Sequence, residues 1–234
     1  MGMKQILVMM AAVVLMGCSK DTPETSQAAE AEPQVTSAPT PEPTPVSPAD
    51  EKLIADPIVE EAIREALVKF GDEELTEADL EKVTYLGLDN TKITDEGLKE
   101  VTKFQNLTFI DLSNTKITDA GLKEVAKLQN LEKLGLDGCI QITDAGFKDV
   151  AKLSNLTLFS LKATKITDAC IKDLAKLQNL ASLFLTNTKI TDAGLKDLAK
   201  LKKLTFLGLS KTKITEEGVA ELKKALPNCI ISGP

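Results

Sequence analysis

The stretch LTFIDLSNTKITDAGL, residues 107–122, decides the fold because its second half recurs along most of the chain. Six versions of the block Asn-Thr-Lys-Ile-Thr-Asp place an isoleucine at successive intervals of 24, 25, 24, 24 and 24 residues. The six isoleucines are Ile93, Ile117, Ile142, Ile166, Ile190 and Ile214. A fixed period in the twenties indicates a solenoid, in which each unit buries its apolar side against its neighbours.

Each unit combines a short strand with a short helix. Ile110 and Leu112 are apolar at alternate positions, as expected of a strand with one buried face. From Asp119 to Leu128, apolar residues recur every three positions on one helical face. Thr118 stands where a helix N-cap is expected, and the Asp119 carboxylate suits the positive start of a helix. The repetition predicts a parallel sheet on one side and helices on the other.

The repeated pattern L-x-x-L-x-L-x-x-[TC]-x-I-T-D-x-G-L resembles the leucine-rich repeat. The version LGLDGCIQITDAGF, with Cys139 in its turn, is most similar to the cysteine-containing subtype known from F-box proteins and from many bacterial repeat proteins. The segment DPIVEEAIREALVKFGDEELTEADLEKVTYLGL resembles the helical caps of bacterial members, and ALPNCIISG resembles their closing edge. No F-box-like segment is recognisable, so an adaptor role in protein degradation is not carried over.

The resemblance spans roughly residues 53–232 and implies an α/β fold. That fold is a leucine-rich repeat solenoid, or horseshoe, with a parallel sheet on the concave side, helices on the convex side and an N-terminal helical cap. We expect the helical cap at residues 51–82, and six repeats with a C-terminal closing edge at residues 83–234. The resemblance specifies the scaffold and no particular ligand, because one fold serves many functions.

The first 18 residues have the features of a secretory signal. Lys4 precedes an apolar run from Ile6 to Met16, which a Gly-Cys pair follows. The ending Leu15-Met16-Gly17-Cys18 resembles the bacterial lipobox, which implies that Cys18 becomes the acylated, palmitate-type first residue of a mature lipoprotein. An uncleaved N-terminal anchor with an incidental cysteine is the alternative interpretation.

Residues 19–50 hold seven of the ten prolines and few large apolar side chains. A stretch of this composition cannot offset its ordering entropy by burial, so we expect a disordered tether. Together with Cys18, it predicts a lipid-anchored, extracytoplasmic protein of the bacterial cell envelope. Ser19, in place of the aspartate that resembles an inner-membrane retention signal, favours the outer membrane.

The composition argues against several function classes. The chain contains no histidine, which removes the commonest general base and the commonest metal ligand. Its formal net charge is -7 and Arg64 is its only arginine, so no nucleic-acid partner is expected. No phosphate-binding glycine loop appears in the sequence. We therefore expect a protein that is not an enzyme and that has no cofactor.

The cysteines other than Cys18 offer no recognisable metal or redox motif. Cys139 takes the place of the threonines in the other repeats, Cys170 replaces a glycine at a helix start, and Cys229 lies in the closing edge. None belongs to a C-x-x-C pair. All three are expected to be small buried residues, and disulfide formation stays open.

A row of acids begins the helices and could be mistaken for a metal ladder. Because each acid follows a cap threonine, we attribute the row to the helix dipole and expect no metal. The row consists of Asp95, Asp119, Asp144, Asp168, Asp192 and Glu216. A second row, of threonines with Cys139, is expected to bond backbone groups in the turns.

The outward positions of the strands are the candidate binding surface. If the apolar residues of each strand point inward, the intervening ones face the concave side. Four of the chain's eight aromatic residues fall in these outward positions, whereas Phe70, Phe104, Phe147 and Phe159 fit the core. The predicted partner-binding residues are Tyr85, Phe109, Asp111, Lys133, Leu158, Phe184 and Phe206. Exposed aromatic residues on a rigid sheet favour recognition, but stacking of β-forming residues along the sheet is an alternative.

The sequence as a whole predicts a membrane-tethered scaffold that binds a protein or peptide through its concave face. The alternative is a structural spacer or envelope-organising module without a single defined ligand. The identity of the ligand does not follow from these residues.

Overall fold

The computed structural model of the protein describes residues 52–69 and 71–233. The chain divides into two units, Met1–Val46 and Ser47–Pro234. The predicted signal peptide, its Cys18 and the predicted tether lie outside the described residues, as does Phe70.

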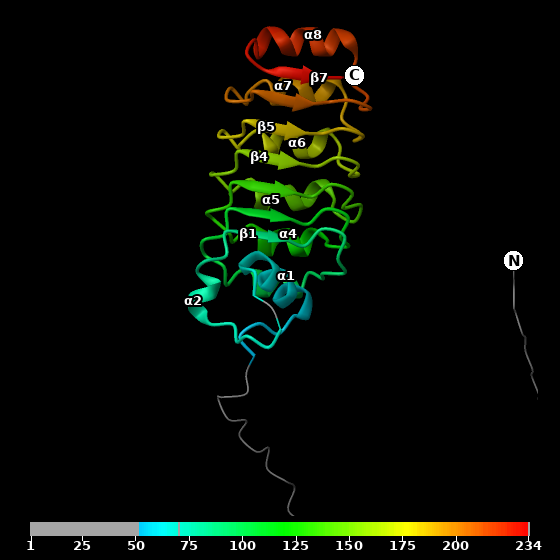
Figure 1. The fold of residues 1–234 in the computed structure, drawn as a ribbon. Helices are drawn as coiled ribbons and strands as arrows, with labels where there is room; N and C mark the ends of the chain where they lie inside the picture. The colour runs from blue at the N-terminus through cyan, green and yellow to red at the C-terminus, as the bar shows by residue number, and fades with distance from the viewer. Residues whose placement is uncertain (1–51, 70, 234) are drawn as a thin grey trace, which may run out of the picture. The chain divides into compact units, whose positions relative to one another are not determined.

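Within the described residues, seven three-residue strands form one parallel sheet whose spatial order follows the chain order. The strands are β1 (Tyr85–Gly87), β2 (Phe109–Asp111), β3 (Lys133–Gly135), β4 (Leu158–Ser160), β5 (Ser182–Phe184), β6 (Phe206–Gly208) and β7 (Ile230–Ser232). The predicted closing edge therefore contributes a seventh strand, in which Ile230 aligns with Phe206. The leucine-rich repeat solenoid expected from the sequence is the observed fold (Figure 1).

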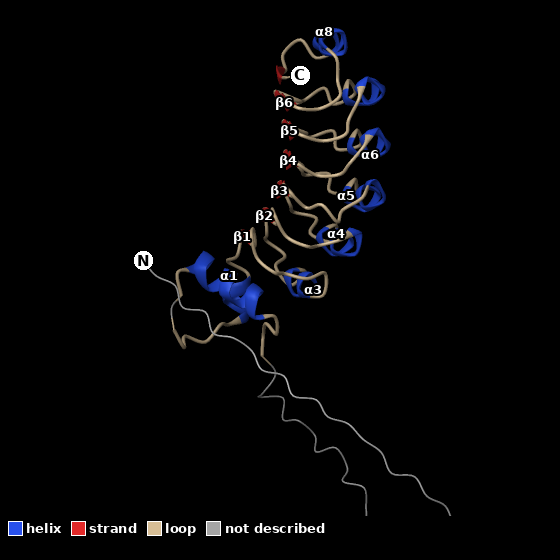
Figure 2. Cartoon of the chain, turned by 90° about the vertical axis from the view of Figure 1, so that its right-hand side faces the viewer, coloured by secondary structure: helices blue, strands red, loops and turns tan. Residues whose placement is uncertain are grey.

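Across the described residues, one α-helix follows each of β1 to β6 on the opposite side of the turn, and two further helices precede β1 at the N-terminal end (Figure 2). They are α1 (Pro57–Leu67), α2 (Glu77–Leu80), α3 (Gly97–Val101), α4 (Asp119–Val125), α5 (Phe147–Val150), α6 (Asp168–Leu174), α7 (Leu195–Leu198) and α8 (Glu216–Ala225). The short 3₁₀ helices η1 (Asp144–Gly146) and η2 (Asp192–Gly194) precede α5 and α7.

Helix α4 is shorter than the predicted segment from Asp119 to Leu128. It ends at Val125, and the N–H of Leu128 donates to the Val125 carbonyl at 3.0 Å, which closes a tight turn. The Gln129 side chain donates to the Ala126 carbonyl and satisfies an acceptor that the helix end leaves free. Leu128 is still buried, so the periodicity identified the buried face correctly and misplaced only the helix end.

The core is a continuous column of aliphatic side chains between the sheet and the helices. The six repeated isoleucines are at most 4 % exposed, and Phe104, Phe147 and Phe159 are fully buried, as predicted. Leu136 in the third repeat is also fully buried. Full burial of a leucine contributes about 1.5–3 kcal/mol, so this column accounts for most of the stabilising free energy.

The N-terminal helices cover the first strand. Helix α1 begins at Pro57 after the N-cap Asp56, whose carboxylate accepts from the N–H groups of Ile58 and Val59. Its buried face, with Val59 and Ile63 fully enclosed, packs next to β1. One end of the sheet is thereby shielded from water, and α1 adjoins the start of the concave face.

Candidate functional site

The outward residues of the strands form two parallel rows across the concave face, in the register that the sequence predicted. In the first row, Tyr85 aligns with Phe109 and Phe109 with Lys133; Leu158, Ser182 and Phe206 follow on the next strands. In the second row, the strands contribute Gly87, Asp111, Gly135, Ser160, Phe184 and Gly208. All seven predicted binding residues therefore lie on this one face.

Tyr85 and Phe109 form what we call the N-terminal aromatic patch. Their ring centroids lie 4.9 Å apart, a favourable spacing for tilted rings. A Cβ added to Gly87 would lie only 2.6 Å from Tyr85 Oη, so the phenol lies across Gly87 and a larger residue there would displace it. Burial raises the pKa of Tyr85, and the nearby carboxylates of Asp111 and Asp89 raise it further. The phenol therefore stays protonated at neutral pH.

Phe184 and Phe206 form what we call the C-terminal aromatic patch, although they belong to different rows. Their ring centroids lie 5.0 Å apart. Gly208 lies beneath both rings, because a Cβ there would lie 3.5 Å from the Phe184 ring and 3.6 Å from the Phe206 ring, which is ordinary contact distance. The expected proximity of the two rings is confirmed.

Lys162 fixes the orientation of this patch. Its Nζ atom lies 4.7 Å from the Phe184 ring centroid and 3.4 Å from Asp137 Oδ2. The Asp137 carboxylate also accepts from the Ser160 hydroxyl and from the Lys162 N–H. A cation between a ring and a carboxylate holds the ring by electrostatic attraction. The sequence prediction did not include Lys162 and Asp137 among the site residues.

The polar part of the face lies between the two patches. Asp111 Oδ1 accepts from the N–H and hydroxyl of Ser113, whereas Lys133 extends from β3 as an exposed cation. Leu158 is half-buried on β4. Not every intervening strand residue that was expected on the concave side is exposed there, because Ser160 is 8 % exposed, and Gly135 and Gly208 are also buried. Larger side chains from neighbouring strands cover these small residues.

The row of acids does more than begin helices, which corrects the sequence interpretation. The Asp144 carboxylate accepts from the Thr167 N–H at 2.8 Å and from its hydroxyl at 2.7 Å, so it joins one repeat to the next. The same two-point bond occurs in Asp95–Thr118, Asp119–Thr143, Asp168–Thr191 and Asp192–Thr215. Within residues 52–69 and 71–233, no cluster of three or more acids and cysteines is arranged to hold a metal ion.

The threonine row bonds backbone groups, as predicted, but within its own repeat. The Thr115 hydroxyl donates to the Leu112 carbonyl at 2.7 Å, and the other threonines of the row make the equivalent bond. Cys139 differs, because its Sγ donates across to the same Leu112 carbonyl at 3.1 Å. Cys139, Cys170 and Cys229 are buried and unpaired, and burial raises the pKa of each thiol. They are structural residues.

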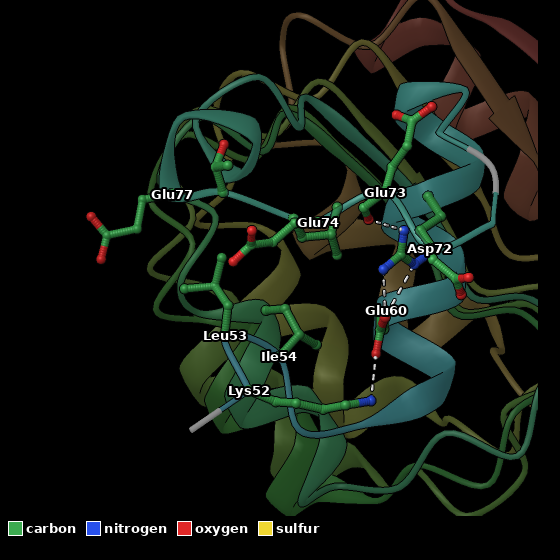
Figure 3. A pocket seen from close by; sticks show the side chains of 11 residues that line it. Lys52, Leu53, Ile54, Glu60, Asp72, Glu73, Glu74 and Glu77 are labelled. Carbon is green, nitrogen blue, oxygen red and sulfur yellow. Dashed lines mark hydrogen bonds and ion pairs between the residues drawn. The ribbon is translucent and has the colours of Figure 1, made fainter. Parts of the chain in front are cut away.

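An open cleft of about 680 Å³ lies at the cap, and no aromatic residue is among its described lining residues (Figure 3). Its basic side chains are engaged: Arg64 donates to Glu60 and to the Glu73 carbonyl, and Lys52 pairs with Glu60. The other charged groups that line it are acids, Asp72, Glu73, Glu74 and Glu77. Among its described lining residues, the cleft combines the apolar side chains of Leu53, Ile54 and Leu75 with mainly acidic groups, and its basic side chains are already paired, so it does not suit an anionic ligand.

The solved structures and family models agree with this architecture. A family model described as leucine-rich repeats, in two copies, matches residues 105–150. Internalin C2 of Listeria monocytogenes is 27% identical, with a TM-score of 0.55, over 78% of this chain and 95% of its own. A leucine-rich repeat protein of Leptospira interrogans is 27% identical, with a TM-score of 0.52, over 66% of this chain and 38% of its own. No curated protein sequence matches the chain.

These observations define the chain as a solenoid of leucine-rich repeats, with solved bacterial leucine-rich repeat proteins as structural neighbours. Leucine-rich repeats form a class of protein-interaction scaffold, whose extended concave surfaces serve for binding. In the part of the chain that the structure describes, no helix combines the length and apolar character that crossing a bilayer requires. The cysteine-containing subtype and the lipoprotein assignment remain predictions.

Proposed function

We propose that the protein is a membrane-tethered, extracytoplasmic scaffold that binds a protein or peptide through its concave face. The observation that carries the proposal is the pair of aromatic patches on that face. Within residues 52–69 and 71–233, every aromatic side chain outside the core lies there, and Tyr85 is 45% exposed. Aromatic side chains held on a rigid surface are favoured as interaction residues, because they bury much apolar area and lose little conformational entropy on binding.

The convex face is a weaker candidate. Its helices carry ion pairs between residues three apart, such as Glu124–Lys127 and Asp173–Lys176. Exposed pairs of this kind contribute little free energy and keep the surface hydrated. Hydrated charges resist the desolvation that a stable interface requires, so this side suits solvent better than a partner.

Binding is also a better account than catalysis. The concave face offers no histidine, and the acids of the helix row are committed to threonine bonds between repeats. The buried thiols are protonated at neutral pH because burial raises their pKa values. A reaction would need an activated nucleophile or a general base, and these groups supply neither.

Capture of the partner tests the proposal against the structural-spacer alternative. The acyl anchor is replaced by an affinity tag, and envelope extracts are passed over the tagged chain and over a Phe184→Ala/Phe206→Ala variant. The proposal predicts one stoichiometric partner that the variant fails to retain. Equal retention by both chains, or the absence of any stoichiometric partner, contradicts it.

The tether is tested separately by changing Cys18 to serine. We expect the variant to leave the membrane fraction, because lipid attachment at Cys18 is the proposed anchor. Stable anchoring requires more than one acyl chain, since each buried methylene contributes only about 0.8 kcal/mol. Mass spectrometry of the mature N-terminus provides the direct readout. An unmodified Cys18 or a retained Met1 would show that the anchor has been assigned wrongly.

A further inference from the structure

The two aromatic patches differ in one respect: the C-terminal patch has its own cation and the N-terminal patch does not. Lys162 lies over the Phe184 ring and pairs with Asp137, so ring, ammonium and carboxylate are all supplied by this chain. Among the described residues, no cation lies over Tyr85 or Phe109, although their rings are as close together as the other pair.

The carboxylates that such a cation would pair with are present beside the N-terminal patch. Asp111 follows Phe109 by two residues on β2, and Asp89 follows Gly87 by two residues at the end of β1. Both are close enough to Tyr85 for their charge to raise the pKa of its phenol, together with Glu65 of α1.

Both carboxylates also keep one oxygen free for a partner. Asp111 Oδ1 receives both bonds from Ser113, and Asp89 Oδ2 receives one bond from Asn90. Neither acid takes part in an ion pair within residues 52–69 and 71–233. The exposed Tyr85 ring, the half-buried Phe109 ring and two unpaired carboxylates form a surface that a positive charge complements.

We propose that the N-terminal aromatic patch binds a lysine or arginine side chain of an extended partner peptide, with Tyr85 and Phe109 beneath the cation and Asp89 and Asp111 beside it. This inference rests on the proposed function and specifies its partner. Arginine suits the place best, because its planar guanidinium can stack on a ring while donating to a carboxylate. The Lys162–Phe184–Asp137 arrangement on the same sheet shows the chemistry already in use.

The second contact of the same peptide is apolar and lies at the far end of the sheet. Phe206 aligns with Ile230 of β7, which is 69% exposed, so the C-terminal patch continues as an apolar surface. Phe109 and Phe206 are separated by four strand intervals, about 19 Å at the usual spacing. An extended peptide that rises 3.1 Å per residue covers this distance in about six residues. The partner motif is therefore a basic residue and an apolar residue about six positions apart.

A phage-displayed library of random linear 12-residue peptides, selected against the full chain, tests the inference. We expect the enriched peptides to share a lysine or arginine about six positions from an apolar residue. Synthetic copies should bind at least tenfold more weakly to the Tyr85→Ala and Asp111→Asn variants. Tyr85→Phe keeps the aromatic ring and should stay within about threefold of the unchanged chain.

A charge exchange makes the test independent of folding defects. Asp89 is exposed at a turn, so Asp89→Lys should leave the fold intact while repelling the basic peptide. Replacing the peptide's basic residue by glutamate should restore binding to this variant by at least tenfold relative to the unchanged peptide. The inference would be overturned if the glutamate peptide did not bind the Asp89→Lys variant better than the unchanged peptide does. It would also be overturned if substitutions at Asp89 and Asp111 left the peptide affinity unchanged.

The outcomes separate this inference from the proposed function. Enriched peptides that lack a basic residue but lose affinity for the Phe184→Ala/Phe206→Ala variant would refute the cation site and leave concave binding intact. Enriched peptides whose affinity is unchanged by every substitution on the concave face would refute both the cation site and the proposed concave binding. The same conclusion follows if no peptide is enriched above an unrelated control protein. The chain's own acidic, proline-rich residues 38–49, APTPEPTPVSPA, lack a basic residue, so occupancy by that segment would also refute the cation site.

Discussion

The Lys162 ammonium group lies over the Phe184 ring on the concave side, with its nitrogen 4.7 Å from the centre of the ring. The two residues are 22 positions apart in the chain: Lys162 lies in the turn after β4, and Phe184 lies in β5. The Lys162 ammonium group remains partly exposed to solvent, and the Asp137 carboxylate balances its charge. The contact restrains the orientation of the Phe184 ring, which lowers the entropic cost of binding a partner there.

The bonds between Asp144 and Thr167 predict a specific loss of stability. Asp144→Ala removes the acceptor of the Thr167 N–H and hydroxyl, so we expect it to cost about 1–3 kcal/mol in urea unfolding. Glu216 is the matched control, because it begins α8 at the same position of the last unit, where no further threonine follows. Glu216→Ala should cost only the helix-dipole contribution of about 0.3–1 kcal/mol. Equal losses would show that the acids act through the dipole alone.

Ala163 predicts a gain in stability. Its φ of 55° lies in the left-handed region, where the equivalent residues of other repeats are Asn90, Asn114, Gly138, Asn187 and Lys211. Ala163→Gly relieves this strain and should stabilise the protein by about 0.5–1 kcal/mol. The same substitution at Ala220, in the middle of exposed α8, should instead cost about 1 kcal/mol. A loss of stability at position 163 would contradict the proposed strain relief.

Asp79 in the cap predicts a dependence of stability on acid pH. Lys69 lies 2.7 Å away, and its bond lowers the pKa of the Asp79 carboxyl, with further help from Thr76 and Lys82. A lowered folded-state pKa stabilises the fold above the unfolded-state value, and this contribution is lost as pH falls below about 4. Asp79→Asn should therefore lower the melting temperature at pH 7, and the deficit should shrink as the pH falls from about 4 toward 2. A deficit that stays constant across this range would show that the carboxylate charge is not its cause.

The sequence predicted the strand register and the face on which each strand residue lies. Both follow from local information: the alternation at Ile110 and Leu112, and a repeat length that varies by one residue. The threonine N-caps were also predictable, and Thr118 accepts from the Ala120 N–H as expected. Each of these features is decided within a single repeat and then copied.

The features that the sequence did not predict depend on distances between repeats. Asp144 and Thr167 are 23 residues apart, and only the rise of the stacked coils shows that they meet. The same holds for Lys162 and Phe184, which are 22 residues apart and come from neighbouring coils. The positions of two glycines beneath aromatic rings could have been predicted from the sequence, since Gly87 and Gly208 each follow an outward aromatic residue by two positions.

The seventh strand was missed for a different reason. Residues 230–232 lie in the segment that resembled a closing edge. The Ile-Thr-Asp block that marks the other repeats is not present in that segment, so no strand was predicted there. Backbone bonds nevertheless continue the ladder, with the Ile230 N–H donating to the Thr205 carbonyl at 2.8 Å. The consequence for the site is that exposed Ile230 extends the C-terminal aromatic patch.

The most direct test of the concave-face account is the affinity of the captured partner for two double variants. Phe184→Ala/Phe206→Ala removes the C-terminal aromatic patch, and Lys148→Ala/Lys172→Ala removes two exposed charges from the convex helices. Isothermal titration calorimetry should show a loss of more than about 2 kcal/mol, or roughly 30-fold, for the aromatic variant. The lysine variant should bind within about 0.5 kcal/mol of the unchanged chain. Normal binding by the aromatic variant, with loss in the lysine variant, would place the working surface on the helices and contradict the account.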